Sequence, residues 1–96
     1  MRPAARLGDS CIPHCSPMSI MTGATTVLIN GRPAARLGDS VTPHLQPARR
    51  CRPHTASIIS GSATVFIEGR PAARLGDKLL MCTAIASGSF NTFIGG

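Results

Sequence analysis

Aromatic residues are scarce in this sequence: its 96 residues include three Phe and no Trp or Tyr. The core must therefore be small, and a chain of this length buries only a modest fraction of its surface. Hydrophobic residues still make up 43% of the chain, which excludes a disordered protein. Ten Gly and eight Pro are typical of a turn-rich β protein, here one domain over residues 1–96. A domain this small is often stapled by a metal or a disulfide.

Long hydrophobic runs are also absent. None approaches the roughly 20 apolar residues that span a bilayer. No hydrophobic stretch follows the first residues, Met1–Arg6, which excludes a secretory signal. We therefore expect the protein to fold in the cytosol and, if exported, to leave by another route. In that compartment four cysteines indicate metal ligands or thiols more often than disulfides.

Acidic residues are few: four stand against ten basic residues, for a net charge of +6. A basic protein invites a nucleic-acid hypothesis, which we keep as the alternative. Six of the nine arginines, however, belong to a repeat and would be spread around several faces. The only local cluster, Arg49-Arg50-Cys51-Arg52, has no aromatic residue beside it to stack on bases. A solvated loop is the better interpretation.

One octapeptide, Arg-Pro-Ala-Ala-Arg-Leu-Gly-Asp, occurs three times, at residues 2–9, 32–39 and 70–77. The copies begin 30 and 38 residues apart, so the middle unit carries eight extra residues. A second motif, Ser/Thr-Gly followed by a β-branched and aromatic run, comes after each copy. The chain thus divides into units 1–30, 31–68 and 69–96. Such repetition predicts either a pseudo-threefold domain or a linear solenoid.

The second motif predicts strands at Thr25–Ile29, Thr64–Ile67 and Asn91–Ile94. Asn30-Gly31, a strong hairpin signal, follows the first of them. The next residues, Arg32–Leu37, alternate in a way that places arginines on one face of a return strand and apolar residues on the other. The repeat proline cannot donate a hydrogen bond, so this strand should lie at an edge.

The chain begins with a return strand and ends with an outgoing one. We expect these two to pair, with Asn91–Ile94 beside Pro3–Leu7. That pairing closes a ring of three β-hairpins, which an open solenoid would not do. The predicted fold is all-β, with pseudo-threefold symmetry.

A metal site is predicted from the residue five positions after each repeat aspartate, which is His14, His44 and Cys82 in turn. In a threefold arrangement equivalent positions converge on the axis. A tetrahedral zinc ion needs a fourth ligand, and His54, in the extra segment of the middle unit, repeats the Pro-His dipeptide. Four protein ligands leave no position for a water, so the site would be structural and the protein no enzyme.

Three further cysteines, Cys11, Cys15 and Cys51, lie near these histidines, and any of them could replace a ligand. The repeat register selects the other set without them, so we interpret them as thiols. A disulfide from Cys11 or Cys15 to Cys51 after export stays open.

The repeated Arg and Asp pairs, such as Arg6 with Asp9, do not indicate acid–base catalysis. Three separate copies of one pair are typical of structural hydrogen bonding around a Gly-Asp turn.

Taken together, the three Pro-Ala-Ala-Arg repeats, the intervening Ser-Gly-x-x-Thr-Val-x-Ile strands and the set His14, His44, His54 and Cys82 closely resemble the PAAR-repeat proteins. The resemblance covers the whole chain. It implies a short cone of β-hairpins, one structural Zn²⁺ held near the apex by those four residues, and a flat base. In that family the base sits on the trimeric spike protein of the bacterial type VI secretion system, valine–glycine-repeat protein G (VgrG).

This resemblance implies one chain per spike trimer, capping it for membrane puncture, with separate effectors or adaptors as further partners. It also implies a bacterial cytoplasmic location before firing, secretion into the target cell afterwards, and only mechanical contact with the membrane. A trimer ends in three identical strand edges, which three similar hairpins can meet by β-augmentation. No fused effector domain is expected, because the chain begins at the first repeat. The expected docking residues are Thr25, Val27, Ile29, Thr64, Val65, Ile67, Thr92 and Ile94.

Overall fold

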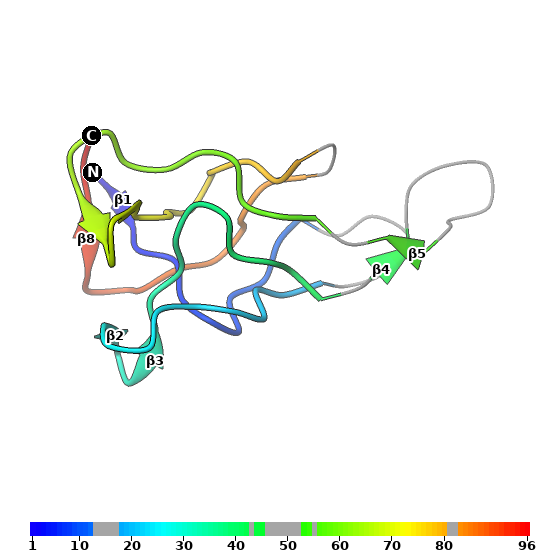
Figure 1. Cartoon of the computed structure of the whole chain (residues 1–96), viewed down its shortest axis with the longest axis horizontal. Helices are drawn as coiled ribbons and strands as arrows, with labels where there is room; N and C mark the ends of the chain where they lie inside the picture. Colours follow the sequence, from blue (N-terminus) through cyan, green and yellow to red (C-terminus); the bar gives the residue numbers. More distant parts are fainter. Residues whose placement is uncertain (13–17, 43, 46–52, 55, 81–82) are drawn as a thin grey trace.

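The computed structural model describes the chain except residues 13–17, 43, 46–52, 55 and 81–82, and in the described part the fold is all-β (Figure 1). The strands form four two-stranded antiparallel sheets, which pair β1 with β8, β2 with β3, β4 with β5 and β6 with β7. Their bounds are β1 Arg2–Pro3, β2 Leu28–Ile29, β3 Arg32–Pro33, β4 His44–Leu45, β5 Pro53–His54, β6 Phe66–Ile67, β7 Arg70–Pro71 and β8 Phe93–Ile94. Among the described residues, no helix has the length and apolar character needed to cross a membrane.

Tight two-residue turns join β2 to β3 and β6 to β7. Both turn residues have positive φ: 54° and 78° at Asn30 and Gly31, and 52° and 81° at Glu68 and Gly69. Positive φ at both central positions defines the type I′ turn, whose twist matches that of the flanking strands. The hairpin predicted from Asn30-Gly31 is confirmed.

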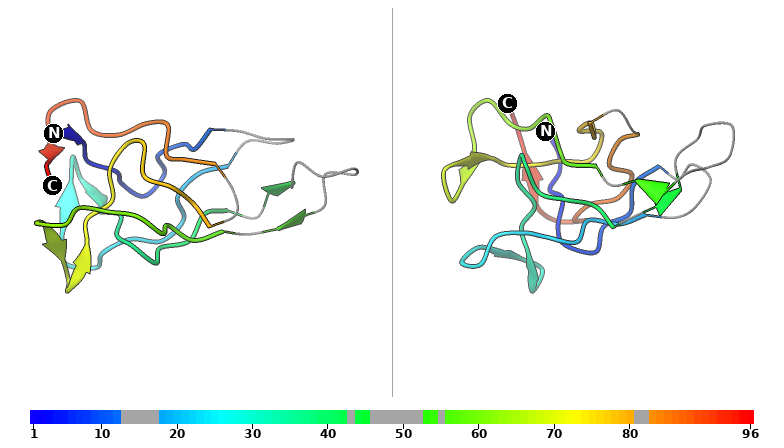
Figure 2. Two further views of the ribbon diagram at one scale, coloured as in Figure 1. Left: turned by 90° about the horizontal axis from the view of Figure 1, so that it is seen from above. Right: turned by 45° about the vertical axis from the view of Figure 1, so that its right-hand side comes forward.

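The two ends of the chain pair with each other. In the β1–β8 ladder Arg2 lies opposite Ile94 and Pro3 opposite Phe93, and the Ala4 amide donates to the Thr92 carbonyl at 2.9 Å. The predicted closure of the ring is therefore confirmed. Figures 1 and 2 show the three ladders β1–β8, β2–β3 and β6–β7 gathered at one end, with β4–β5 at the other. We call these the hairpin end and the loop end.

The strands are shorter than predicted. Regular pairing covers only the Arg-Pro dipeptide of each repeat and the last two residues of each outgoing run. After the proline, each repeat leaves its hairpin and bridges to the other units, with Ala4 opposite Arg74, Arg6 opposite Ala34 and Arg36 opposite Ala72. The return segment therefore serves as the junction between units, which a local sequence pattern cannot reveal.

The second alanines of the three repeats, Ala5, Ala35 and Ala73, form a closed ring of backbone hydrogen bonds. Ala5 donates to the carbonyl of Ala73, Ala73 to that of Ala35, and Ala35 to that of Ala5, each at 3.0 Å. All three residues are fully buried. We call this set the alanine ring, and it marks the pseudo-threefold axis.

Glycines of the second motif pack directly on the repeats. A Cβ atom added at Gly61 would lie 2.9 Å from the Ala72 carbonyl oxygen, and one at Gly88 would lie 2.9 Å from that of Ala4. Such contacts are too short for any side chain. The Ser/Thr-Gly motif therefore has glycine because two backbones touch there.

The core consists of two clusters stacked along the axis. Toward the hairpin end, Ile29, Ile67 and Ile94 pack with the first alanines of the repeats. The second cluster surrounds the alanine ring and includes the fully buried Ile20, Ile58 and Ile85. Most members occur in sets of three, one per unit, so the symmetry extends to the side chains.

The predicted separation of arginines from apolar residues is wrong. Arg6, Arg36 and Arg74 are buried, with exposed fractions of 8%, 7% and 5%. The leucine after each of them is only half-buried. The segment crosses between units instead of lying on a sheet surface, and each arginine has a buried counterion.

The alanine ring yields a first prediction. Replacing Ala35 by Val should lower the free energy of unfolding by about 1–3 kcal/mol, because extra methyl groups have no space beside a backbone ring. Urea denaturation measures the change.

The matched control is Ala63→Val. Ala63 is exposed, and the equivalent positions hold Thr25 and Phe90, so a larger side chain fits there. We expect a change within about 0.5 kcal/mol. Equal effects of the two substitutions would contradict the role given to the ring.

Candidate functional site

Each repeat contains a buried ion pair between its second arginine and its aspartate. In the first unit, Asp9 Oδ2 accepts hydrogen bonds from the Arg6 backbone amide at 2.7 Å and from Arg6 Nε at 3.0 Å, and Oδ1 accepts one from Nη2 at 3.0 Å. Arg36 with Asp39 and Arg74 with Asp77 repeat this geometry. We call Arg6, Arg36 and Arg74 the inner arginines. The structural role predicted for these pairs is confirmed.

The same carboxylates join the units. Asp9 also accepts from Arg32 Nη2 and from Ser87 Oγ, each at 3.1 Å, and these donors belong to the two other units. Asp77 accepts likewise from Arg2 at 3.2 Å and Ser60 at 3.0 Å. Bidentate pairing with arginine suits a carboxylate that must stay charged when buried. Each aspartate is therefore a junction between repeats.

The surroundings of Asp9 act on its pKa in opposite directions. Burial, the largest single influence, raises the pKa. The hydrogen bonds from the Arg6 side chain and backbone, the Arg6 charge and the Ser87 hydroxyl together outweigh it, so the pKa of Asp9 lies below its ordinary value. The hydrogen bond to Asp39 is the main reason that the pKa of Arg36 is raised. Both shifts favour the ion-paired state.

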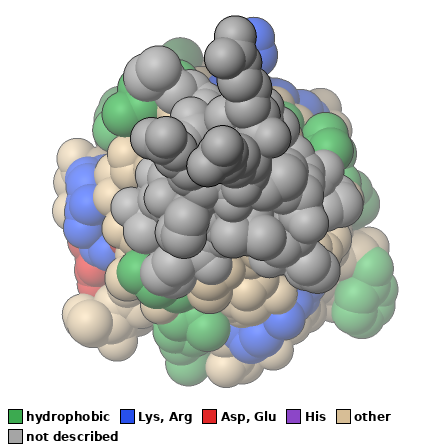
Figure 3. Space-filling model, turned by 90° about the vertical axis from the view of Figure 1, so that its right-hand side faces the viewer, with side chains coloured by type: hydrophobic (Ala, Val, Ile, Leu, Met, Phe, Trp, Pro, Cys, Tyr) green, Lys and Arg blue, Asp and Glu red, His purple; other side chains and the backbone are tan. Residues whose placement is uncertain are grey.

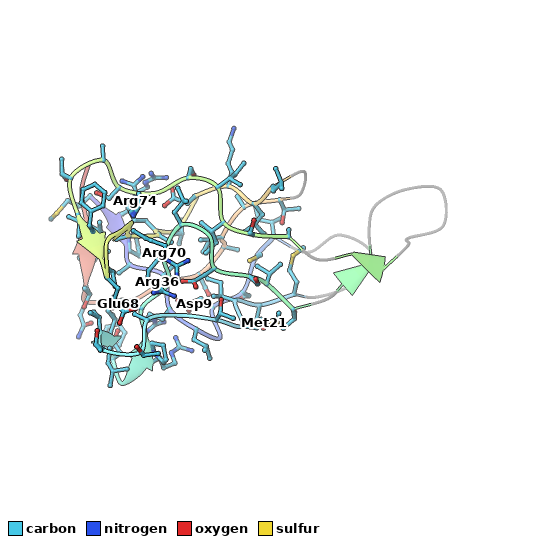
Figure 4. The ribbon with its side chains drawn as sticks, viewed as in Figure 1. Asp9, Met21, Arg36, Glu68, Arg70 and Arg74 are labelled. Carbon is cyan, nitrogen blue, oxygen red and sulfur yellow. The ribbon has the colours of Figure 1, made fainter. Side chains whose placement is uncertain are left out.

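Each inner arginine also contacts the hairpin end: Arg6 and Arg36 reach hairpin turns, and Arg74 reaches the C-terminal end of the chain. Arg6 Nη1 donates to Asn30 Oδ1 at 2.9 Å, and Arg74 Nη1 donates to the Gly95 carbonyl at 3.1 Å. Arg36 Nη1 pairs with the Glu68 carboxylate, and both side chains are labelled in Figure 4. The arginines thus couple the buried aspartates to the hairpin end and hold its turns in place.

At the hairpin end, β2, β6 and β8 each expose one large apolar side chain. Leu28, Phe66 and Phe93 occupy equivalent positions and are 61%, 58% and 47% exposed. Each lies opposite the proline of its return strand. We call these three residues the apolar triad. It gives this end three similar contact points related by the pseudo-threefold axis.

The docking residues predicted from the sequence divide into three groups by burial. Thr25, Thr64 and Val65 are exposed, Val27 and Thr92 are half-buried, and Ile29, Ile67 and Ile94 are buried in the core. The isoleucines therefore pack inside the domain. Sequence reasoning passed over the apolar triad, although strand alternation places each triad residue on the face opposite its neighbouring isoleucine.

Three loops leave the body at the loop end from equivalent positions. Backbone hydrogen bonds close them at their bases, from Cys11 to Met18 at 3.2 Å, Val41 to Ala56 at 3.0 Å and Leu79 to Thr83 at 2.9 Å. Since these pairs correspond under the threefold, the loops start side by side at one end. The four predicted metal ligands all belong to these loops.

Two of these ligands lie in the described part of the chain. His44 and His54 stand directly opposite each other in the β4–β5 ladder. His14 and Cys82 lie outside the described residues, as do the alternatives Cys15 and Cys51. Cys11 is buried in the core cluster. Among described residues alone, no group of three or more His, Cys, Asp or Glu could hold a metal.

One polar atom near these loops has no hydrogen-bond partner. In the part of the chain that the structure describes, Thr83 Oγ1 is the buried side-chain oxygen left unsatisfied. Thr83 comes directly after Cys82.

The repeat arginines do not gather into one basic surface. The inner arginines are buried in ion pairs, and Arg2 and Arg32 pair with aspartates of other units. Seen from the loop end, Lys and Arg side chains lie at separate places around the rim (Figure 3). Among the residues that the structure describes, this arrangement lacks the single basic stripe typical of nucleic-acid-binding domains. The Arg49–Arg52 cluster lies outside the described residues.

Comparison with known proteins supports one family. The family model described as "PAAR motif" matches residues 1–43 and 50–96. No curated protein sequence matches the chain at a significant level.

The buried carboxylates yield a prediction on pH. Because the folded state lowers the pKa of Asp9, its contribution to stability is complete above the ordinary value of 3.8 and is lost as the pH falls through the folded value. With EDTA present to exclude metal effects, the free energy of unfolding should fall below about pH 4, by up to about 1.4 kcal/mol per pH unit for each proton bound.

The variant Asp9→Asn tests the cause. It should cost about 3–5 kcal/mol at pH 7, because it leaves the Arg6 charge buried without a counterion. Its remaining stability should depend less on acid pH than that of the parent protein. Parallel pH profiles of the two proteins would show that Asp9 is not responsible.

Proposed function

The chain belongs to the PAAR-motif family of type VI secretion spike-tip proteins, and from this premise we propose that one copy caps the end of a trimeric VgrG spike. The observation that carries the proposal is the gathering of three equivalent two-stranded ladders at one end of a single chain (Figure 2). A homotrimer presents three copies of one surface at its end. A chain with three equivalent ladders can contact all three copies at once, whereas a chain with one ladder would need three molecules.

The apolar triad is the proposed contact. Its residues sit at threefold-related positions and remain about half exposed or more, unlike the neighbouring isoleucines. Apolar anchors that become buried commonly dominate interface energies. The hairpin backbones beside them can extend the partner's strands by β-augmentation. The inner arginines hold the turns and so present this surface in one conformation, which lowers the entropic cost of docking.

At the loop end we propose one structural Zn²⁺ held by His14, His44, His54 and Cys82. Two observations support the fit: the three loops begin side by side, and His44 faces His54 in register. Three imidazoles and a thiolate suit tetrahedral zinc. Ligands from all three units would tie the loops together, and a closed site of this kind contributes folding energy instead of catalysis. The ion would stiffen the end of the spike that meets a membrane.

Secretion follows from this assignment as part of the proposal. A spike tip assembles in the bacterial cytoplasm and leaves with the spike when the system fires. Separate effectors or adaptors are further proposed partners, carried on the same tip.

Docking is tested with a matched pair of leucines. Leu28→Asp places a charge within the apolar triad, and we expect it to weaken binding to the VgrG trimer at least tenfold. Leu80→Asp changes a leucine that is 51% exposed near the loop end, and binding should stay within about twofold. Analytical ultracentrifugation should give one chain per trimer for the parent protein and the control.

Three chains per trimer, or equal loss of binding for both variants, would overturn the proposed geometry. If the folded protein bound no spike trimer but bound DNA, with affinity falling steeply as salt rises, the nucleic-acid alternative would replace the proposal.

Metal content is tested by elemental analysis of the purified protein, with one zinc per chain expected. The double variant His44→Ala with Cys82→Ala should lose the metal, because two ligands cannot hold it in a closed site. Cys15→Ala and Cys51→Ala should each keep it. Zinc retained by the double variant, or lost with either single cysteine, would refute the proposed ligand set.

A further inference from the structure

Thr83 carries a buried hydroxyl that nothing in the described fold explains. Its Oγ1 atom is shielded from solvent and has no hydrogen-bond partner. Buried side-chain oxygen atoms are nearly always hydrogen-bonded, because removal from water without a replacement partner is unfavourable. A buried polar atom without a partner therefore indicates that a further group hydrogen-bonds to it, such as a water molecule or a residue that holds a metal ion.

The symmetry shows that the fold itself does not need this hydroxyl. Thr83 occupies the position held by Met18 and Ala56 in the other two units, as the equivalent loop-closing hydrogen bonds establish. Both of those residues are buried in the core cluster around the alanine ring. Two of the three units therefore have a buried apolar side chain at this position, and only the third unit has a hydroxyl there.

The third unit differs from the others in one further respect. At the predicted ligand position it has a cysteine, Cys82, where the first two units have histidine. The hydroxyl and the thiol are thus adjacent exceptions to the repeat. The backbone of Thr83 is held in place, since its carbonyl accepts the Leu79 amide at 2.9 Å.

We propose that the Thr83 hydroxyl hydrogen-bonds to one of the residues that hold the zinc ion and fixes the orientation of that ligand. The inference rests on the proposed zinc site. Metal ligands in proteins are commonly oriented by hydrogen bonds from a second layer of residues. A hydroxyl can donate to a thiolate or accept from an imidazole N–H, so Thr83 can serve either kind of ligand in the predicted set. Thr83 is then a positioning residue and not a ligand.

The test compares Thr83→Val with Thr83→Ser in the zinc-loaded full chain. Valine keeps the shape and removes the hydroxyl, whereas serine keeps the hydroxyl. We expect Thr83→Val to release zinc to the chelator 4-(2-pyridylazo)resorcinol about tenfold faster or more, because loss of an orienting hydrogen bond typically lowers metal affinity about 10–100-fold. Thr83→Ser should stay within about twofold of the parent. Thr64→Val, at the hairpin end, is the control and should leave the rate of zinc release unchanged.

A second readout separates ligand orientation from general loosening of the fold. In the Co²⁺-loaded protein, Thr83→Val should shift the absorption bands, whereas Thr64→Val should not. A shift of the sulfur-to-cobalt charge-transfer band identifies the thiolate as the hydrogen-bonded ligand, and a shift of the d–d bands alone identifies an imidazole.

The outcomes distinguish this inference from the zinc proposal beneath it. Parent protein that contains no zinc removes both. Parent protein with zinc, combined with unchanged zinc release and an unchanged cobalt spectrum in Thr83→Val, overturns the role of Thr83 and leaves the zinc site intact.

Discussion

The alanine ring is the constraint on which the rest of the structure depends. Three backbone hydrogen bonds join Ala5, Ala35 and Ala73 around the pseudo-threefold axis, so three chain segments meet at backbone distance. Only a small side chain fits beside such a contact. The first alanine of each repeat bridges to an inner arginine of another unit, and the glycines of the second motif pack on the same segments. This geometry accounts for the identical repeats, because each copy has to fit into an equivalent confined space around the axis.

The buried aspartates then link the three units electrostatically. Asp9 binds the arginine of its own repeat, an arginine of the next and a hydroxyl of the third. A carboxylate with this many donors remains charged despite burial, and its removal leaves guanidinium groups without counterions. These pairs bury the three inner arginines, so among the described residues the arginines of the repeats do not form a single basic face.

The two ends of the molecule differ in how closely the three units resemble one another. At the hairpin end the units agree, and each presents an apolar triad residue beside a proline. At the loop end they diverge: the predicted ligand is histidine twice and cysteine once, and the middle unit carries extra residues. Three similar surfaces at the hairpin end suit a threefold-symmetric partner. Different residues at the loop end suit a single zinc ion, because four ligands cannot come from exact threefold repetition.

The all-β class, the threefold repetition, the tight hairpins and the pairing of the chain ends were predicted from the amino-acid sequence. These features depend on exact repetition and on turn residues such as Asn30-Gly31, which act locally. The sequence also pointed to four zinc ligands. Of these the structure places His44 opposite His54, and the zinc site itself stays a proposal.

Which side chains are buried depends on packing between the units, and the local sequence pattern did not predict it. The alternation along Arg32–Leu37 predicted arginines on one face and apolar residues on the other, but Ala34, Ala35 and Arg36 are all buried, Arg36 against Asp39. For the same reason, the sequence pattern did not show that the apolar triad residues are exposed and that the neighbouring isoleucines are buried. An alternating pattern distinguishes the two faces of a strand, but a face is buried only when another part of the chain packs against it. Here that part belongs to another unit, about 30 or more residues away in the sequence. Burial therefore depends on how the three units pack in the folded ring.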